Sequence, residues 1–134
     1  MPTDPPERAA RSISADPRHA LGRLGERLAA EHLERLGYRI VARNHRTRFG
    51  EIDLIAADDE TLVFCEVKTR RAGSGAPWDA LDDRKRKQVR SMGAAWLCET
   101  HERPRTAELR FDAIGVLIGA DGALVDLVHL EGAF

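Results

Sequence analysis

The chain has 134 residues and 43% of them are hydrophobic, which suits a single domain with one core. Charged residues make up 32% and the formal net charge is −1, so overall charge does not identify a nucleic-acid binder. Two cysteines and five scattered histidines exclude a disulfide framework and a Cys/His zinc site, and no apolar run approaches the roughly 18 residues of a membrane span. We therefore expect a cytoplasmic protein with no membrane partner.

The N-terminal residues 1–19 are rich in Pro, Arg, Asp and Ala and lack apolar periodicity. We expect them to form a disordered tail before one domain at residues 20–134. Helical spacing of apolar residues then predicts a helix over residues 20–36, ended by Gly37. Its apolar band consists of Leu21, Leu24, Leu28, Ala29, Leu33 and Leu36.

The rest of the chain alternates between strand and helix patterns. Three strands are predicted first, at residues 38–46, 50–57 and 61–70, with a polar turn at 58–60. A flexible loop, a second helix and a final hairpin follow, at residues 72–77, 78–100, and 111–118 with 123–130. The order α-β-β-β-α-β-β predicts an α/β fold with a mixed β-sheet flanked by helices.

Two of the predicted strands carry charge inside otherwise apolar sequence. Asp53 shares a face of its strand with Glu51, and Glu66 shares a face with Lys68, because side chains alternate along a strand. Buried charges are costly unless they are paired or hold a metal. These four residues are therefore the first candidates for a functional site.

The spacing alone leaves structural explanations open. Lys68 could form an ordinary ion pair with Asp53 or Glu66 on a solvated face of the sheet. Glu51 could be a solvated charge at a strand end or an auxiliary group beside the site, and Glu26 could be an acid that favours the first turns of its helix. Other charged and polar candidates on the second helix could simply face solvent.

These residue types also suit metal-dependent phosphodiester hydrolysis. Asp53 and Glu66 on adjacent strands could hold Mg²⁺ or Mn²⁺, with the backbone carbonyl of Val67 as a third ligand. Lys68 could position the attacking water and offset charge in the transition state. Glu26, next to glycines in its helix that permit close backbone approach, could bind the metal through water or hold a second metal.

Basic residues gather in two parts of the chain, before Glu51 and after Glu66. If they share a surface around Asp53, they could bind nucleic acid through its phosphates; otherwise they are ordinary solvated charges. The candidates for this surface are Arg43, Arg46, Arg70, Arg71, Arg84 and Lys85.

Three segments together resemble a known family: GRLGE at residues 22–26, GEIDLI at 50–55 and FCEVKTR at 64–70. They resemble the PD-(D/E)xK nuclease superfamily. More closely, the chain looks like the small YraN-like bacterial family, which is similar to archaeal Holliday-junction resolvases. The resemblance covers the whole of the expected domain, and Phe111-Asp112 and the closing 132–134 fit it too.

The resemblance implies a restriction-endonuclease-like core with active-site positions at Glu26, Asp53, Glu66 and Lys68, and Gln88 as an auxiliary residue. It also implies a Mg²⁺- or Mn²⁺-dependent endonuclease for structured or branched DNA, which could act as a homodimer. Two other functions remain: a non-catalytic nucleic-acid-binding module with the same fold, and a protein-interaction scaffold.

Overall fold

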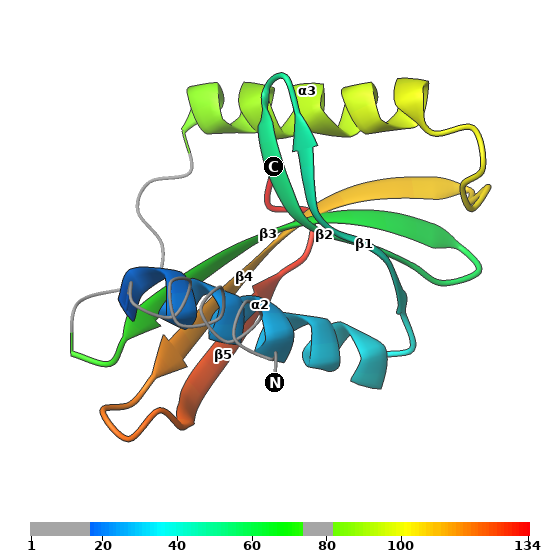
Figure 1. Cartoon of the computed structure of the whole chain (residues 1–134). Helices are drawn as coiled ribbons and strands as arrows, with labels where there is room; N and C mark the ends of the chain where they lie inside the picture. The colour runs from blue at the N-terminus through cyan, green and yellow to red at the C-terminus, as the bar shows by residue number, and fades with distance from the viewer. Residues whose placement is uncertain (1–16, 74–81) are drawn as a thin grey trace, which may run out of the picture.

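The computed structural model describes residues 17–73 and 82–134. Its elements are α2 (Pro17–Arg35), β1 (Arg39–Thr47), β2 (Gly50–Ala57), β3 (Thr61–Arg71), α3 (Asp83–Glu99), β4 (Glu108–Ile118) and β5 (Leu124–Leu130). The strands form one sheet in the order β1-β2-β3-β4-β5, in which only β3 and β4 are parallel. The predicted mixed sheet flanked by helices is therefore confirmed (Figure 1).

The two helices cover opposite faces of the sheet, α2 on one and α3 on the other (Figure 1). Alternation along β3 sends Val63, Cys65 and Val67 into the core beneath α2, and Leu62 and Phe64 into the core beneath α3. The continuous apolar run of this strand thus reflects burial on both faces.

Helix α2 begins at Pro17, three residues before the predicted start, and proline suits the first turn of a helix. It ends as predicted at a glycine: Gly37 has φ +101°, and the N–H of Tyr38 bonds to the carbonyl of Leu33 at 3.0 Å. Leu36 was wrongly placed in the apolar band, because it follows the last helical residue and is 52% exposed. Of the predicted disordered tail, residues 1–16 lie outside the described residues, and 17–19 are helical.

Helix α3 begins later than predicted. Asp82 has an extended backbone, and its side chain accepts a hydrogen bond from the Lys85 N–H at 2.9 Å. This cap satisfies an N–H that has no partner within the helix, so Asp83 is the first helical residue. Residues 78–81 of the predicted helix and 74–77 of the predicted loop lie outside the described residues.

Strand β4 begins at Glu108, three residues before its predicted start, because it pairs with β3 along the full length of both strands. Its first residues are charged or exposed, and so they carry no apolar strand pattern. None of the helices in the described ranges is long and apolar enough to span a membrane.

Candidate functional site

Strands β2 and β3 separate where the sequence places Asp53 and Glu66. Their residues pair from Ala57 and Leu62 as far as Leu54 and Cys65, and the pairing ends there. Beyond this point β2 continues with β1 as a hairpin that rises toward α3, while β3 stays beside β4 (Figure 1). We call this opening the fork; it is bounded by Asp53 on β2 and by residues 66–68 on β3.

The hairpin is held against α3 at its tip. Gln88 on α3 donates a hydrogen bond from Nε2 to the Phe49 carbonyl at 3.0 Å. A Cβ built on Gly50 would lie 2.9 Å from the same Nε2 atom, and Gly50 has φ +136°. Gln88 therefore fixes the hairpin that carries one side of the fork.

Asp53 bridges the fork through the backbone of β3. Its Oδ2 accepts a hydrogen bond from the Val67 N–H at 2.8 Å. The carboxylate thus gives this N–H a partner where the β2–β3 pairing has ended.

The surroundings of Asp53 strongly disfavour its charged form. Burial and, after it, the neighbouring Glu66 raise the pKa of Asp53 to about 7, against the lowering effect of the Val67 N–H. Glu26 and Glu51 add smaller contributions in the same direction. The fork therefore brings together the four acidic residues predicted from the sequence, from α2, β2 and β3.

Glu66 has a cation partner, and that partner comes from α3. Lys85 Nζ lies 3.0 Å from Glu66 Oε2, and only 13% of the Glu66 side chain is exposed. Lys85, which was predicted as a nucleic-acid contact, thus lies beside the fork and is paired with Glu66 there. Among the residues that the structure describes, no ion pair joins Lys68 to either carboxylate.

Glu26 reaches the fork from α2. A Cβ built on Gly25 would overlap the side chain of Thr69, so this glycine allows the helix to pass close to β3, as expected. At Gly22, where close approach was also expected, nothing lies within 4 Å of such a Cβ. Glu26 Oε1 accepts a hydrogen bond from Asn44 Nδ2 at 2.8 Å. Asn44 has a positive φ of 49° and had not been predicted as a site residue.

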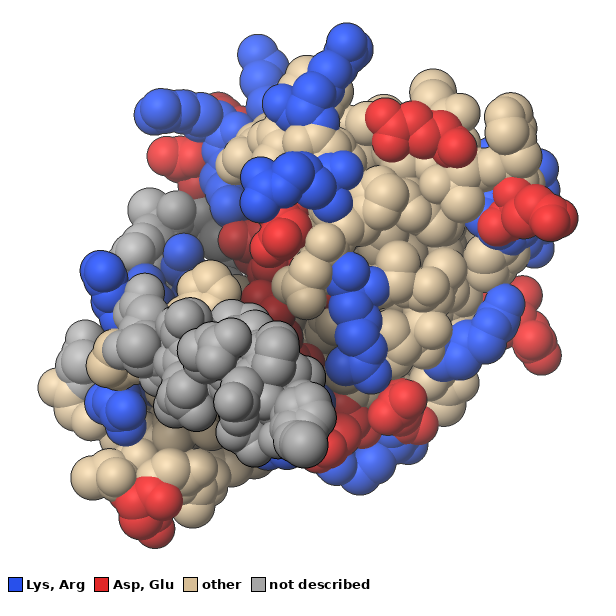
Figure 2. Space-filling model, in the orientation of Figure 1, with Lys and Arg blue, Asp and Glu red and all other residues tan. Residues whose placement is uncertain are grey.

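The predicted basic residues lie on two sides of the fork. Arg43 and Arg46 are exposed on β1, and Arg84 is exposed at the start of α3. On the α2 side, Arg70 and Arg71 line a groove of about 550 Å³ whose other lining residues are Arg18, Leu21, Gly22, Glu26, Val67, Lys68 and Thr69. Figure 2 shows acidic side chains set back at the centre of this face, below basic side chains over the hairpin and α3.

The oxygen atoms of Asp53, Glu66 and the Val67 carbonyl are donors of the type that a hard divalent cation prefers. In the described ranges, no three His, Cys, Asp or Glu side chains are placed to bind one metal ion together. The predicted set needs only Asp53 and Glu66 as direct side-chain ligands, with the Val67 carbonyl and a water held by Glu26. Oxygen ligands suit Mg²⁺ or Mn²⁺, and the mutual repulsion of the carboxylates is what a cation relieves.

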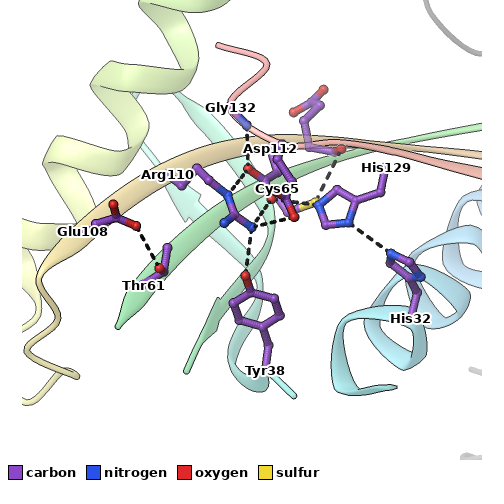
Figure 3. A network of polar contacts seen from close by, with 11 residues as sticks. His32, Tyr38, Thr61, Cys65, Glu108, Arg110, Asp112, His129 and Gly132 are labelled. Atoms are coloured by element: carbon purple, nitrogen blue, oxygen red, sulfur yellow. Dashed lines mark hydrogen bonds and ion pairs between the residues drawn. The ribbon is translucent and has the colours of Figure 1, made fainter. Parts of the chain in front are cut away.

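A second group of polar residues, the Asp112 cluster, lies under α2 and was not predicted as a site. It joins β4, β5, α2 and the residue before β1, and its members are His32, Tyr38, Arg110, Asp112, His129 and Gly132 (Figure 3). Asp112 is completely buried. The signal that could have identified it is an acid within an apolar strand, the same signal that identified Asp53.

Every neighbour of Asp112 in this cluster is a donor. Arg110 bonds to both carboxylate oxygens, at 2.8 and 2.9 Å, His129 Nε2 lies 2.8 Å from Oδ2, and the Gly132 N–H donates to Oδ1 at 3.0 Å. Burial by itself raises the pKa of Asp112, but these bonds outweigh it and hold the pKa below its ordinary value. The other ring nitrogen of His129, Nδ1, lies 3.0 Å from Nε2 of His32 on α2.

Comparison with known sequences identifies relatives along most of the chain. A 45% identical protein of Acidothermus cellulolyticus matches over 131 residues, which is 90% of this chain and 98% of the relative. Proteins of Rhodococcus opacus (42% identical, 86% of this chain and 96% of the relative) and Geobacter sulfurreducens (45%, 85% and 88%) are similar. All three are described only as UPF0102 proteins.

A family profile matches residues 25–116, a range that runs from α2 through the fork and α3 into β4. This range includes Glu26, Asp53, Glu66, Lys68 and Lys85. The chain belongs to the family described as uncharacterised protein family UPF0102.

Proposed function

We propose that the fork is the active site of a nuclease of the PD-(D/E)xK type, which hydrolyses phosphodiester bonds in structured or branched DNA with Mg²⁺ or Mn²⁺. The observation that carries the proposal is the environment of Asp53. It is a largely buried carboxyl group with a pKa of about 7, crowded by Glu66 on β3, by Glu26 on α2 and by Glu51 on its own strand. Strongly shifted carboxyl groups of this kind concentrate at catalytic and metal sites.

Asp53 and Glu66 would hold the metal, together with the backbone carbonyl of Val67. A bound ion would polarise the scissile phosphate as a Lewis acid and make water at the site easier to deprotonate. Glu26 would orient that water from the α2 side. Lys68 would offset negative charge on the phosphate oxygens during attack, from the groove that adjoins the fork.

The basic residues on both sides of the fork would hold the nucleic acid. Arg43, Arg46 and Arg84 lie on the hairpin and α3 side, and Arg70 and Arg71 lie along the groove. Contacts of this kind bind phosphates and position the strand without reading its sequence. This arrangement fits a substrate recognised by its shape.

A cleavage assay tests the proposal. Labelled four-way junction, flap, duplex and single-stranded DNA would be incubated with Mg²⁺, Mn²⁺ or chelator. We expect metal-dependent cleavage that is lost in Asp53→Asn and retained in Asp59→Asn, a matched change of an exposed turn residue. Equal cleavage by wild type and Asp53→Asn would remove the fork from the mechanism.

The Lys85–Glu66 ion pair favours a second candidate, a nucleic-acid-binding module without catalysis. Lys85 neutralises one of the two proposed metal ligands at 3.0 Å. A binding module of this kind predicts salt-sensitive DNA binding and no cleavage with any metal. The same reactions, run on native gels at two salt concentrations, distinguish these outcomes.

A further inference from the structure

Asn44 has an unusual backbone conformation for a residue inside a strand. Among the residues that the structure describes, it is the only one other than glycine with a positive φ, at 49°. Asparagine tolerates this left-handed region better than most residues. Its side chain is exposed, so the packing of the core does not require this conformation. Backbone outliers of this kind concentrate at functional sites.

The left-handed conformation turns the Asn44 side chain toward α2. Ala42 packs against the core beneath α3, and regular alternation would place Asn44 on the same face of the sheet. The Asn44 amide instead bonds to Glu26 on α2 at 2.8 Å. The next residue, His45, lies 3.8 Å from Glu99 on α3, so Asn44 alone breaks the alternation toward α2 at this point of β1.

The register of the β1–β2 hairpin also places Asn44 beside the fork. Arg43 pairs with Leu54 and His45 pairs with Ile52, and so Asn44 stands opposite Asp53. Opposite residues in antiparallel strands have Cα atoms about 4.5–5.5 Å apart. The Asn44 amide therefore ties Glu26 on α2 to the pair of strands that carries Asp53.

We infer that Asn44 is a positioning residue that holds the Glu26 carboxylate beside Asp53. Its role rests on the proposed function, in which Glu26 orients the attacking water. A carboxylate can only accept hydrogen bonds, so the amide nitrogen faces Oε1 of Glu26. The other carboxylate oxygen is then left for water. Because the amide is neutral, it fixes the side chain without offsetting the negative charge that attracts a cation.

The conformation of Asn44 allows its amide to be removed without strain. Glycine adopts a positive φ freely, so Asn44→Gly keeps the backbone and loses only the side chain. It should lower kcat for DNA cleavage about 10-fold and leave KM for DNA unchanged, since residues that orient a metal site through another side chain have effects of this size. Asn44→Asp suits the same backbone but replaces the donor by an acceptor, and should lose at least as much activity.

A double-mutant cycle tests whether Asn44 acts through Glu26. Asn44→Gly should cause no further loss in a Glu26→Ala background, because the partner of the amide is already absent. In a Glu34→Ala background the full loss should remain, since Glu34 is an exposed glutamate of the same helix. Calorimetric titration with Mn²⁺ in the absence of DNA gives a second cycle that does not need cleavage. There Asn44→Gly should weaken Mn²⁺ binding about 10-fold, except in Glu26→Ala.

The two cycles separate this inference from the nuclease. Cleavage by wild type with equal losses in the Glu26→Ala and Glu34→Ala backgrounds would overturn the role of Asn44 and leave the nuclease standing. A wild type that shows the coupled loss of Mn²⁺ affinity but cleaves none of the DNA substrates would overturn the nuclease and support the role of Asn44. A wild type that neither cleaves DNA nor binds Mn²⁺ would overturn both.

Discussion

Asp53 and Asp112 occupy the two strands on either side of β3, and both lie within apolar sequence, yet their surroundings are opposite. Asp112 is met by a guanidinium, an imidazole and a backbone N–H. Asp53 receives one backbone N–H and otherwise faces acids. As a result, the pKa of Asp112 is lowered and that of Asp53 is raised to about 7.

Burial of an acid therefore does not by itself identify a functional site. What matters is whether the fold supplies enough donors to satisfy the carboxylate. At Asp112 it does, and the residue stabilises the protein. At Asp53 it does not, and this shortage of donors is what the proposed metal ion would relieve.

The largest expected effect is the loss of the satisfied carboxylate. Asp112→Ala leaves Arg110 and the Gly132 N–H without their partner, and we expect the free energy of unfolding to fall by about 3–5 kcal/mol. Denaturant unfolding measures this loss. Asp59→Ala, at an exposed turn, should change stability by less than about 0.5 kcal/mol. A similarly small effect of Asp112→Ala would show that the cluster contributes little.

The two aspartates should also give stability opposite dependences on pH. The folded state keeps a proton on Asp53 that the unfolded chain releases from about pH 4, so stability should fall as pH rises from about 4 to about 7, by at most about 4 kcal/mol. Asp112, with its lowered pKa, stabilises the protein above about pH 4 and loses this contribution in acid.

Unfolding measured across this range in wild type and Asp53→Asn isolates the first contribution. The difference in stability between the two proteins should grow from pH 4 to pH 7 and then level off, in favour of the variant. A difference that does not change with pH would mean that Asp53 titrates normally.

A divalent cation should relieve the crowding at Asp53. At a concentration about 100 times its dissociation constant, Mg²⁺ or Mn²⁺ should add about 2.7 kcal/mol of stability. Thermal unfolding with metal or with chelator measures this gain, which Asp53→Asn should abolish. Asp112→Asn should keep the gain even though the variant is less stable. An identical melting temperature of wild type with metal and with chelator would contradict the proposed metal site.

A smaller effect is expected at Lys85. Lys85→Met removes the cation beside Glu66, and because Lys85 is 32% exposed, we expect a loss of only about 0.5–1 kcal/mol. Lys87→Met, an exposed residue of the same helix, is the matched control. Equal stability of the two variants in denaturant would mean that the Lys85–Glu66 ion pair makes no net contribution to the free energy of unfolding.

The features of the two aspartate regions that depend on local sequence pattern could be predicted from the sequence. Alternation identified β2 and β3 and the charges within them, and Gly37 marked the end of α2. The predicted start of α3 was wrong because the helical spacing of apolar residues continues on the N-terminal side of Asp82. The N-cap that begins the helix is one hydrogen bond from the Lys85 N–H to the Asp82 side chain, which that spacing does not reveal.

Contacts between distant residues could not be predicted in this way. The pairing of Glu66 with Lys85 depends on how α3 crosses the sheet, and nothing in the order of residues favours Lys85 over Lys68. Arg110 and His129 appear in the sequence as ordinary charges on strands. They become partners of Asp112 only when α2, β4 and β5 have come together.

The distances along the chain that these contacts span have a consequence for folding kinetics. The Asp53–Val67 bond joins residues 14 positions apart, whereas Tyr38–Arg110 spans 72 positions and His32–His129 spans 97. Contacts that close long loops form later, because the entropy of closure must be overcome first. We therefore expect the β1–β2–β3 meander, with the Asp53–Val67 bond, to form early in folding. We expect the Asp112 cluster to form last, when it joins the two ends of the described chain.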